Sequence, residues 1–205
     1  MNTNEIDLAD TSAVTINSTS ILASRHHDFC VGHRVYGHES KCSHLHGHNY
    51  RVKFSVVSLN NLDKIGRVLD FSAIDKKLCQ WIEQNWDHKF LVWEKDPVAK
   101  ALLELDEEGT CLVPFNPTAE NMGLYLINFV GPTFLPPETE LRSVDIQETR
   151  KCSVTVTKTS SNIAAATVTS VYSPVLGSET THGRRKYREV TKESGPTQKE
   201  MTWVW

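Results

Sequence analysis

The sequence contains no apolar run near 20 residues, and it does not begin with a basic segment followed by an apolar one. We therefore expect neither a membrane span nor a secretory signal. The net charge is −3, so the sequence lacks the basic excess that is typical of nucleic-acid binding. Five cysteines, an odd number without framework spacing, favour reduced thiols in a cytoplasmic compartment over a disulfide scaffold.

The composition suits one ordinary domain with tails. At 205 residues, with 39% hydrophobic and 23% charged residues, the chain can bury a single core. Residues 1–20 are polar and rich in Thr, Ser and Asn, which predicts a flexible N-terminal arm, and residues 21–159 then form the domain. Residues 160–205 predict an extension that is either mobile or docks on a partner or a neighbouring subunit.

Hydrophobic periodicity predicts two strands, two helices and two further strands. The expected strands cover 21–35, 49–59, 140–149 and 152–159. The expected helices cover 70–85, with Asp70 or Ser72 as cap, and a segment that starts at Thr118. Residues 96–110 are acidic and are expected to form a surface connection, with a turn of helix at 101–105. This order predicts an α+β fold, in which two helices cover one face of a four-stranded antiparallel sheet.

Both helices are expected to bury one apolar stripe. The stripe of the first helix contains Phe71, Ile74, Leu78, Trp81 and Ile82. The stripe of the second helix contains Met122, Tyr125, Leu126 and Phe129.

Residues 42–48 read Cys-Ser-His-Leu-His-Gly-His and lead into the second expected strand. In an extended segment His46 and His48 project to the same side, so both imidazoles can bind one metal ion. A catalytic zinc site takes three protein ligands and one open position. His33 lies one hairpin length upstream, where an antiparallel strand would carry it across. His44 has the same parity and remains an alternative ligand.

Six separated landmarks make the chain resemble a known family, the 6-pyruvoyl-tetrahydropterin and 6-carboxytetrahydropterin synthase superfamily. The landmarks are residues 29–35, 42–50, 66–71, 86–88, 116–121 and 147–149. Members of this superfamily have the T-fold, so the resemblance implies a ββααββ domain whose sheets join between subunits into a barrel. It also implies a homohexamer with active sites shared between neighbouring subunits.

The resemblance places the zinc ligands on His33, His46 and His48, and the catalytic proton acceptor on Cys42. A nearby cation lowers the pKa of a thiol and favours the thiolate, whereas the alternative for Cys42 is a small buried packing residue. The other cysteines match no catalytic position and are expected to pack: Cys30, Cys79, Cys111 and Cys152.

By the same resemblance, Asp87 and His88 complete the acid–base machinery, with His88 exchanging a proton and Asp87 holding its tautomer. The alternative is a polar pair at a helix end. Glu148 matches the pterin anchor, because one carboxylate can accept two adjacent N–H groups of the ring. Thr118 and Glu120 match the element that lines the same pocket, although a plain helix start explains them almost as well.

Three residues separate Cys42 from His46, a spacing that resembles the 6-carboxytetrahydropterin synthases of 7-deazaguanine and queuosine biosynthesis. These zinc lyases act on 7,8-dihydroneopterin triphosphate. Two alternatives stay open: the sister 6-pyruvoyl-tetrahydropterin synthase, which typically has a longer insertion at this point, and a non-catalytic T-fold scaffold. The presence of Cys42, Asp87, His88 and Glu148 argues against the scaffold.

Overall fold

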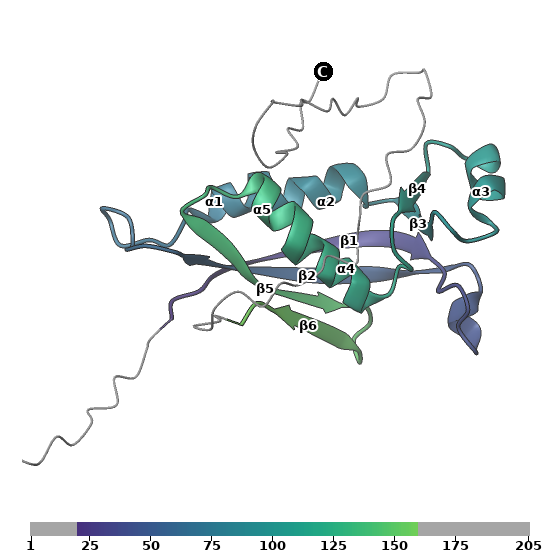
Figure 1. Cartoon of the computed structure of the whole chain (residues 1–205), viewed down its shortest axis with the longest axis horizontal. Helices are drawn as coiled ribbons and strands as arrows, with labels where there is room; N and C mark the ends of the chain where they lie inside the picture. Colours follow the sequence, from purple (N-terminus) through teal and green to yellow (C-terminus); the bar gives the residue numbers. More distant parts are fainter. Residues whose placement is uncertain (1–19, 160–205) are drawn as a thin grey trace, which may run out of the picture. The chain divides into compact units, whose positions relative to one another are not determined.

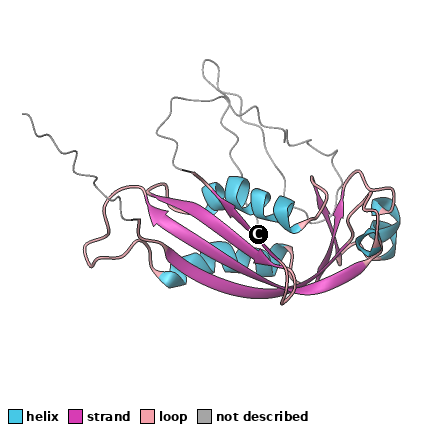
Figure 2. Ribbon diagram, turned by 90° about the horizontal axis from the view of Figure 1, so that it is seen from below, coloured by secondary structure: helices cyan, strands magenta, loops and turns pink. Residues whose placement is uncertain are grey.

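The structure, a computed structural model, describes residues 20–159. The predicted arm 1–20, apart from residue 20, and the predicted extension 160–205 lie outside this range. The described residues form a curled six-stranded sheet with two helical segments packed on it (Figures 1 and 2). None of the described helices has the length and apolar content needed to cross a bilayer.

The strands are β1 (Ala23–His33), β2 (His46–Ser58), β3 (Lys89–Trp93), β4 (Thr110–Val113), β5 (Thr139–Gln147) and β6 (Ser153–Thr157). The first helical segment is continuous and consists of α1 (Phe71–Ile74), the π-helical η2 (Asp75–Cys79) and α2 (Gln80–Asn85). The second consists of α4 (Ala119–Tyr125), the π-helical η3 (Leu126–Val130) and α5 (Gly131–Phe134). A 3₁₀ turn, η1 (Lys41–Ser43), and a short helix, α3 (Ala99–Leu105), lie in the connections.

The sheet has the strand order β4-β3-β1-β2-β5-β6. Strands β1, β2, β5 and β6 pair antiparallel, as predicted. The prediction of four strands was incomplete, because β3 pairs parallel with the end of β1 and β4 pairs parallel with β3. The expected surface connection 96–110 therefore links two paired strands, and it contains α3, which lies at the β3–β4 end of the sheet (Figure 1).

The β1–β2 hairpin positions the metal motif at the end where its strands are connected. In its register His33 lies opposite His46 and Gly32 lies opposite Gly47. Side chains alternate, so His33 shares the buried face of the sheet with Phe29 and Val31. The polar His33 side chain is thus placed at the end of the hydrophobic core.

The helical segments begin at side-chain caps and bury one stripe each. The Asp70 carboxylate accepts from Ser72 N, and the Thr118 hydroxyl accepts from Asn121 N. Most of the predicted stripe residues are buried or half-buried. Phe71 and Phe129 were predicted to be buried as well, but they are 57% and 37% exposed. Phe71 is the first residue of α1, where the helix begins.

Candidate metal and catalytic site

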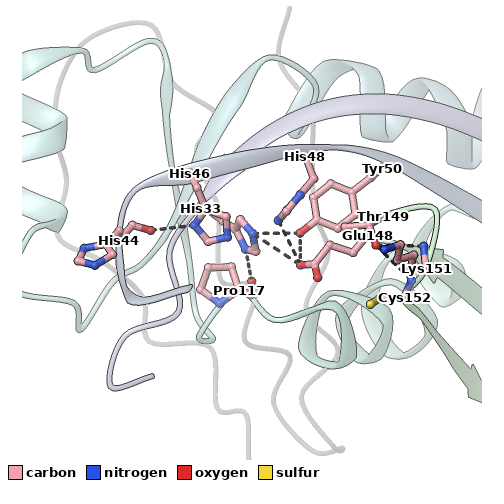
Figure 3. Close-up of polar contacts among 10 residues, drawn as sticks. All are labelled: His33, His44, His46, His48, Tyr50, Pro117, Glu148, Thr149, Lys151 and Cys152. Carbon is pink, nitrogen blue, oxygen red and sulfur yellow. Dashed lines mark hydrogen bonds and ion pairs between the residues drawn. The ribbon is translucent and has the colours of Figure 1, made fainter. Parts of the chain in front are cut away.

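Three histidines converge at the end of the β1–β2 hairpin, as the sequence predicts. The ligand nitrogens of His33, His46 and His48 lie within 4.8 Å of one another (Figure 3). His33 is buried, whereas His46 and His48 are half-buried. The cluster is therefore covered by protein on one side and accessible on the other.

In His33 and His46, a hydrogen bond to a main-chain carbonyl determines which ring nitrogen keeps its lone pair. His33 Nδ1 donates to the Pro117 carbonyl at 2.8 Å, and His46 Nδ1 donates to the His44 carbonyl at 2.8 Å. A carbonyl can only accept, so Nδ1 carries the hydrogen and Nε2 keeps its lone pair in both rings. The exposed His44 ring points away from the cluster, and His44 takes part only through its main chain (Figure 3).

The cluster could hold a metal ion. Burial lowers the pKa of His33 and so favours the neutral imidazole that a metal requires. Three imidazoles with a solvent-accessible side match the ligand set of a site that keeps one open position. A structural zinc site would be expected to contain a fourth cysteine or histidine, and no fourth such residue belongs to the cluster in residues 20–159.

Tyr50 connects the cluster to Glu148. The Tyr50 hydroxyl donates to Glu148 Oε1 at 2.8 Å and lies 3.2 Å from His33 Nε2. The same carboxylate oxygen lies 3.6 Å from His33 Nε2 and 3.9 Å from His48 Nε2. Burial and the Glu148 charge raise the pKa of Tyr50, so its hydroxyl stays protonated and serves as a donor. Glu148 therefore lies directly beside the histidine cluster.

Cys42 lies in η1, the turn that precedes β2. Its carbonyl accepts from Val35 N at 2.8 Å, and its thiol is half-buried. Burial raises the pKa of Cys79 and of Cys111 to about 11, so both remain neutral thiols. The prediction that the other cysteines pack is wrong for Cys30 and Cys152, which are exposed in β1 and in the β5–β6 turn.

Asp87 and His88 form a hydrogen-bonded pair in the tight turn between α2 and β3. His88 Nδ1 donates to Asp87 Oδ2 at 2.7 Å, and Cys30 N donates to Asp87 Oδ1 at 2.8 Å. Adjacent residues on a helix do not face each other. Here His88 has left the helix and has a φ of 55°, in the left-handed region, and its side chain can meet that of Asp87. Burial alone would raise the pKa of Asp87, but the hydrogen bonds from Cys30 and His88 outweigh it and lower that pKa.

The Asp87–His88 pair lies beside an open hollow rather than in the histidine cluster. The hollow has a volume of about 890 Å³, and His48, Glu148 and His88 are among the residues that line it. The His88 side chain is 80% exposed. Thr118 and Glu120 are not part of its lining: Thr118 caps α4, and Glu120 is exposed in the first turn of α4. The Thr118 hydroxyl makes the hydrogen bond of a helix cap.

The family model described as 6-pyruvoyl tetrahydropterin synthase matches residues 23–159. The chain belongs to this family. A family member from Rickettsia typhi named 6-carboxy-5,6,7,8-tetrahydropterin synthase is 34% identical over 138 residues, which are 66% of this chain and 99% of the relative. A Halobacterium salinarum protein named probable 6-carboxy-5,6,7,8-tetrahydropterin synthase is 32% identical over 121 residues, 58% of this chain and 75% of the relative.

Among solved structures, an uncharacterized protein from Wolinella succinogenes aligns with a TM-score of 0.60 at 23% identity. The alignment covers 69% of this chain and all of the other, and it supports the fold. The predictions of a T-fold and of an enzyme of the 6-pyruvoyl tetrahydropterin synthase family are thus confirmed.

Sequence reasoning missed Tyr50 and Pro117. Tyr50 has the same strand parity as His46 and His48, so its position beside the ligands could have been predicted. The Pro117 carbonyl gives no sequence signal, because every residue has a carbonyl group.

Proposed function

We propose that the chain is a 6-carboxy-5,6,7,8-tetrahydropterin synthase. It converts 7,8-dihydroneopterin triphosphate and one water into 6-carboxytetrahydropterin, triphosphate and acetaldehyde, in the cytoplasm and as a step toward 7-deazaguanine compounds such as queuosine. The observation that carries the proposal is the three-residue spacing between Cys42 and His46, in a chain whose similar relatives carry this name. The convergence of the histidines beside Glu148 supports it.

His33, His46 and His48 would hold a zinc ion through their Nε2 atoms. When bound, zinc polarises the side-chain hydroxyls of the substrate and stabilises the negative charge that develops as protons move. The main-chain acceptors of His33 and His46 keep both rings in the tautomer that this role requires.

Each remaining group has one task in the proposed reaction. Cys42 accepts a proton from the substrate side chain, and His88 exchanges a second proton with the substrate. Asp87 is the hydrogen-bond partner that orients His88. The Glu148 carboxylate accepts the ring N–H groups of the pterin, and the buried Tyr50 hydroxyl holds that carboxylate in place. Thr118 and Glu120, at the start of α4, are proposed to bind the substrate from outside the lining of the hollow.

The products distinguish this function from its alternatives. Incubation of the purified protein with 7,8-dihydroneopterin triphosphate is expected to yield a 6-carboxy pterin, seen by mass spectrometry, together with one trapped acetaldehyde per triphosphate. The sister enzyme would release triphosphate without aldehyde and keep the three-carbon side chain. Consequently a 6-pyruvoyl product would refute the carboxy assignment, and a lack of any turnover by zinc-loaded protein would favour the scaffold.

We also propose a homohexamer that shares its active sites between subunits. In the described sheet β6 is an outer strand, and β3 covers β1 only at Val31–His33, so residues 23–30 of β1 have a partner on one side only. Such open edges favour pairing with another copy. Among the described residues, the hydrogen bonds of Asp87 and His88 connect their turn to α2 and β1 but not to the loop that carries Cys42, so Cys42 would meet this pair from a neighbouring subunit.

Light scattering is expected to show six chains per particle. Mixing the inactive variants Cys42→Ala and His88→Ala under subunit exchange is expected to restore part of the activity, because some mixed sites then contain both intact groups. Each variant exchanged with itself is the control and should stay inactive. A monomer at working concentration contradicts the assembly, and a mixed hexamer without recovered activity contradicts the shared site.

A further inference from the structure

The Asn116 side chain joins the loop that carries Cys42 to the segment before α4. Asn116 Oδ1 accepts from Tyr36 N at 2.9 Å, and Asn116 Nδ2 donates to the Tyr36 carbonyl at 2.8 Å. A side-chain amide has the same donor and acceptor as a peptide unit, so Asn116 pairs with the Tyr36 backbone as a neighbouring strand would. The pairing joins residues that are 80 positions apart in the sequence.

The same short segment also holds a metal ligand. Pro117, the residue after Asn116, provides the carbonyl that accepts from His33 Nδ1. On the loop side, Val35 precedes Tyr36 and donates its N–H to the Cys42 carbonyl at 2.8 Å. The dipeptide Asn116–Pro117 therefore contacts both the metal ligand His33 and the main chain that holds Cys42.

Both partners of this pairing are themselves fixed. The Asn116 carbonyl accepts from Thr118 N at 2.8 Å and from Asn121 Nδ2 at 2.9 Å, which ties it to the start of α4. Arg34, two residues before Tyr36, forms a 2.9 Å ion pair with the buried carboxylate of Asp96. The Asn116 side chain thus connects two restrained segments, and little freedom is left between them.

We propose that Asn116 is a positioning residue that sets the distance between the Cys42 thiol and the histidine cluster. The inference rests on the proposed function, in which Cys42 takes a proton from a substrate bound at the cluster. Among the described residues, the hydrogen bonds of Cys42 involve its main chain and not its thiol. Loss of the Asn116–Tyr36 pairing would therefore let the loop shift and carry the thiol with it. A displacement of about 1 Å in a catalytic group can cost about 10²-fold in rate.

The test is Asn116→Ala in the full-length, zinc-loaded protein. We expect kcat to fall by about 10²-fold, whereas KM and zinc content stay at the wild-type values, because Glu148 and the three histidines keep their contacts. Amide hydrogen exchange at Tyr36 is expected to accelerate, since this N–H loses its acceptor. Thr133→Val is the control, because it removes a side-chain hydrogen bond to the Phe129 carbonyl at the second helical segment, outside the site.

A purely structural role for Asn116 would lower the melting temperature and leave kcat per folded chain unchanged, and that result would overturn the proposal. Loss of zinc together with activity would also overturn it, because the segment would then serve His33 alone. Should Asn116→Ala not fold, Asn116→Asp keeps the acceptor for Tyr36 N and loses the donor. It is expected to reduce kcat with zinc retained, and wild-type kcat in this variant would refute the role.

The failure of this proposal can be told apart from failure of the proposed function. If wild-type protein does not turn over 7,8-dihydroneopterin triphosphate, or if Cys42→Ala is fully active, the function or its mechanism is wrong whatever Asn116 does. If wild type is active and Cys42→Ala is not, the rate of Asn116→Ala tests the positioning role alone. Hydrogen exchange at Tyr36 reports on the pairing without any substrate.

Discussion

Cys42→Ala is expected to lower turnover by about 10²- to 10⁴-fold, the range typical of a lost general base, while zinc stays bound. The reason is that the proposed zinc ligands are the three histidines of the cluster, and the Cys42 thiol is not part of that cluster. Single-turnover kinetics with 7,8-dihydroneopterin triphosphate measures the loss, and elemental analysis measures the zinc.

Cys111→Ala is the matched control for this variant. Cys111 is half-buried like Cys42, but burial raises the pKa of its thiol to about 11, so it stays protonated at neutral pH and cannot act as a base. Its removal should leave kcat close to wild type. Full activity of Cys42→Ala would show that another group takes the proton, even if the product is the 6-carboxy pterin.

His46→Ala and His48→Ala are each expected to reduce bound zinc from about one per chain to a small fraction. Loss of an outer hydrogen-bond partner typically weakens metal binding by about 10- to 100-fold, and loss of a ligand should cost more. Elemental analysis after dialysis against a weak chelator provides the measurement. Zinc content equal to wild type in both variants would contradict the assignment of the cluster.

His44→Ala tests whether the His44 side chain is a zinc ligand. The His44 ring points away from the cluster, but its carbonyl accepts from His46 Nδ1, and alanine keeps that carbonyl (Figure 3). Zinc content should therefore remain at the wild-type value. A zinc loss in His44→Ala as large as that in His46→Ala would instead support the alternative ligand that the sequence leaves open.

The sequence predicts the metal cluster well, because strand parity and hairpin register are local rules. Parity places His46 and His48 on one face, and the antiparallel register then brings His33 opposite His46. The sequence analysis did not predict β3 and β4, because these strands are short and pair in parallel with strands distant in the sequence. Four or five residues carry too little periodicity to specify such contacts, and strand preference depends on the surrounding sheet.

The Asp87–His88 pair shows a second limit. The sequence indicates that these adjacent residues need a turn to act together, and the structure provides one through the positive φ of His88. That backbone state is uncommon for residues other than glycine, so a single sequence gives no reason to expect it. The Asn116–Tyr36 pairing was likewise unpredictable, because one of its two partners is main chain.

The outer acceptors of His33 and His46 are the main-chain carbonyls of Pro117 and His44. A side-chain acceptor can be removed by one substitution, and some can gain a proton. A peptide carbonyl is present whatever the side chain, and it is not protonated near neutral pH. The tautomers of these two rings are therefore determined by the main-chain conformation. They do not depend on the side chains of the residues that supply the acceptors. Related proteins are free to differ at position 44 without losing this part of the metal site, provided that the loop keeps its course.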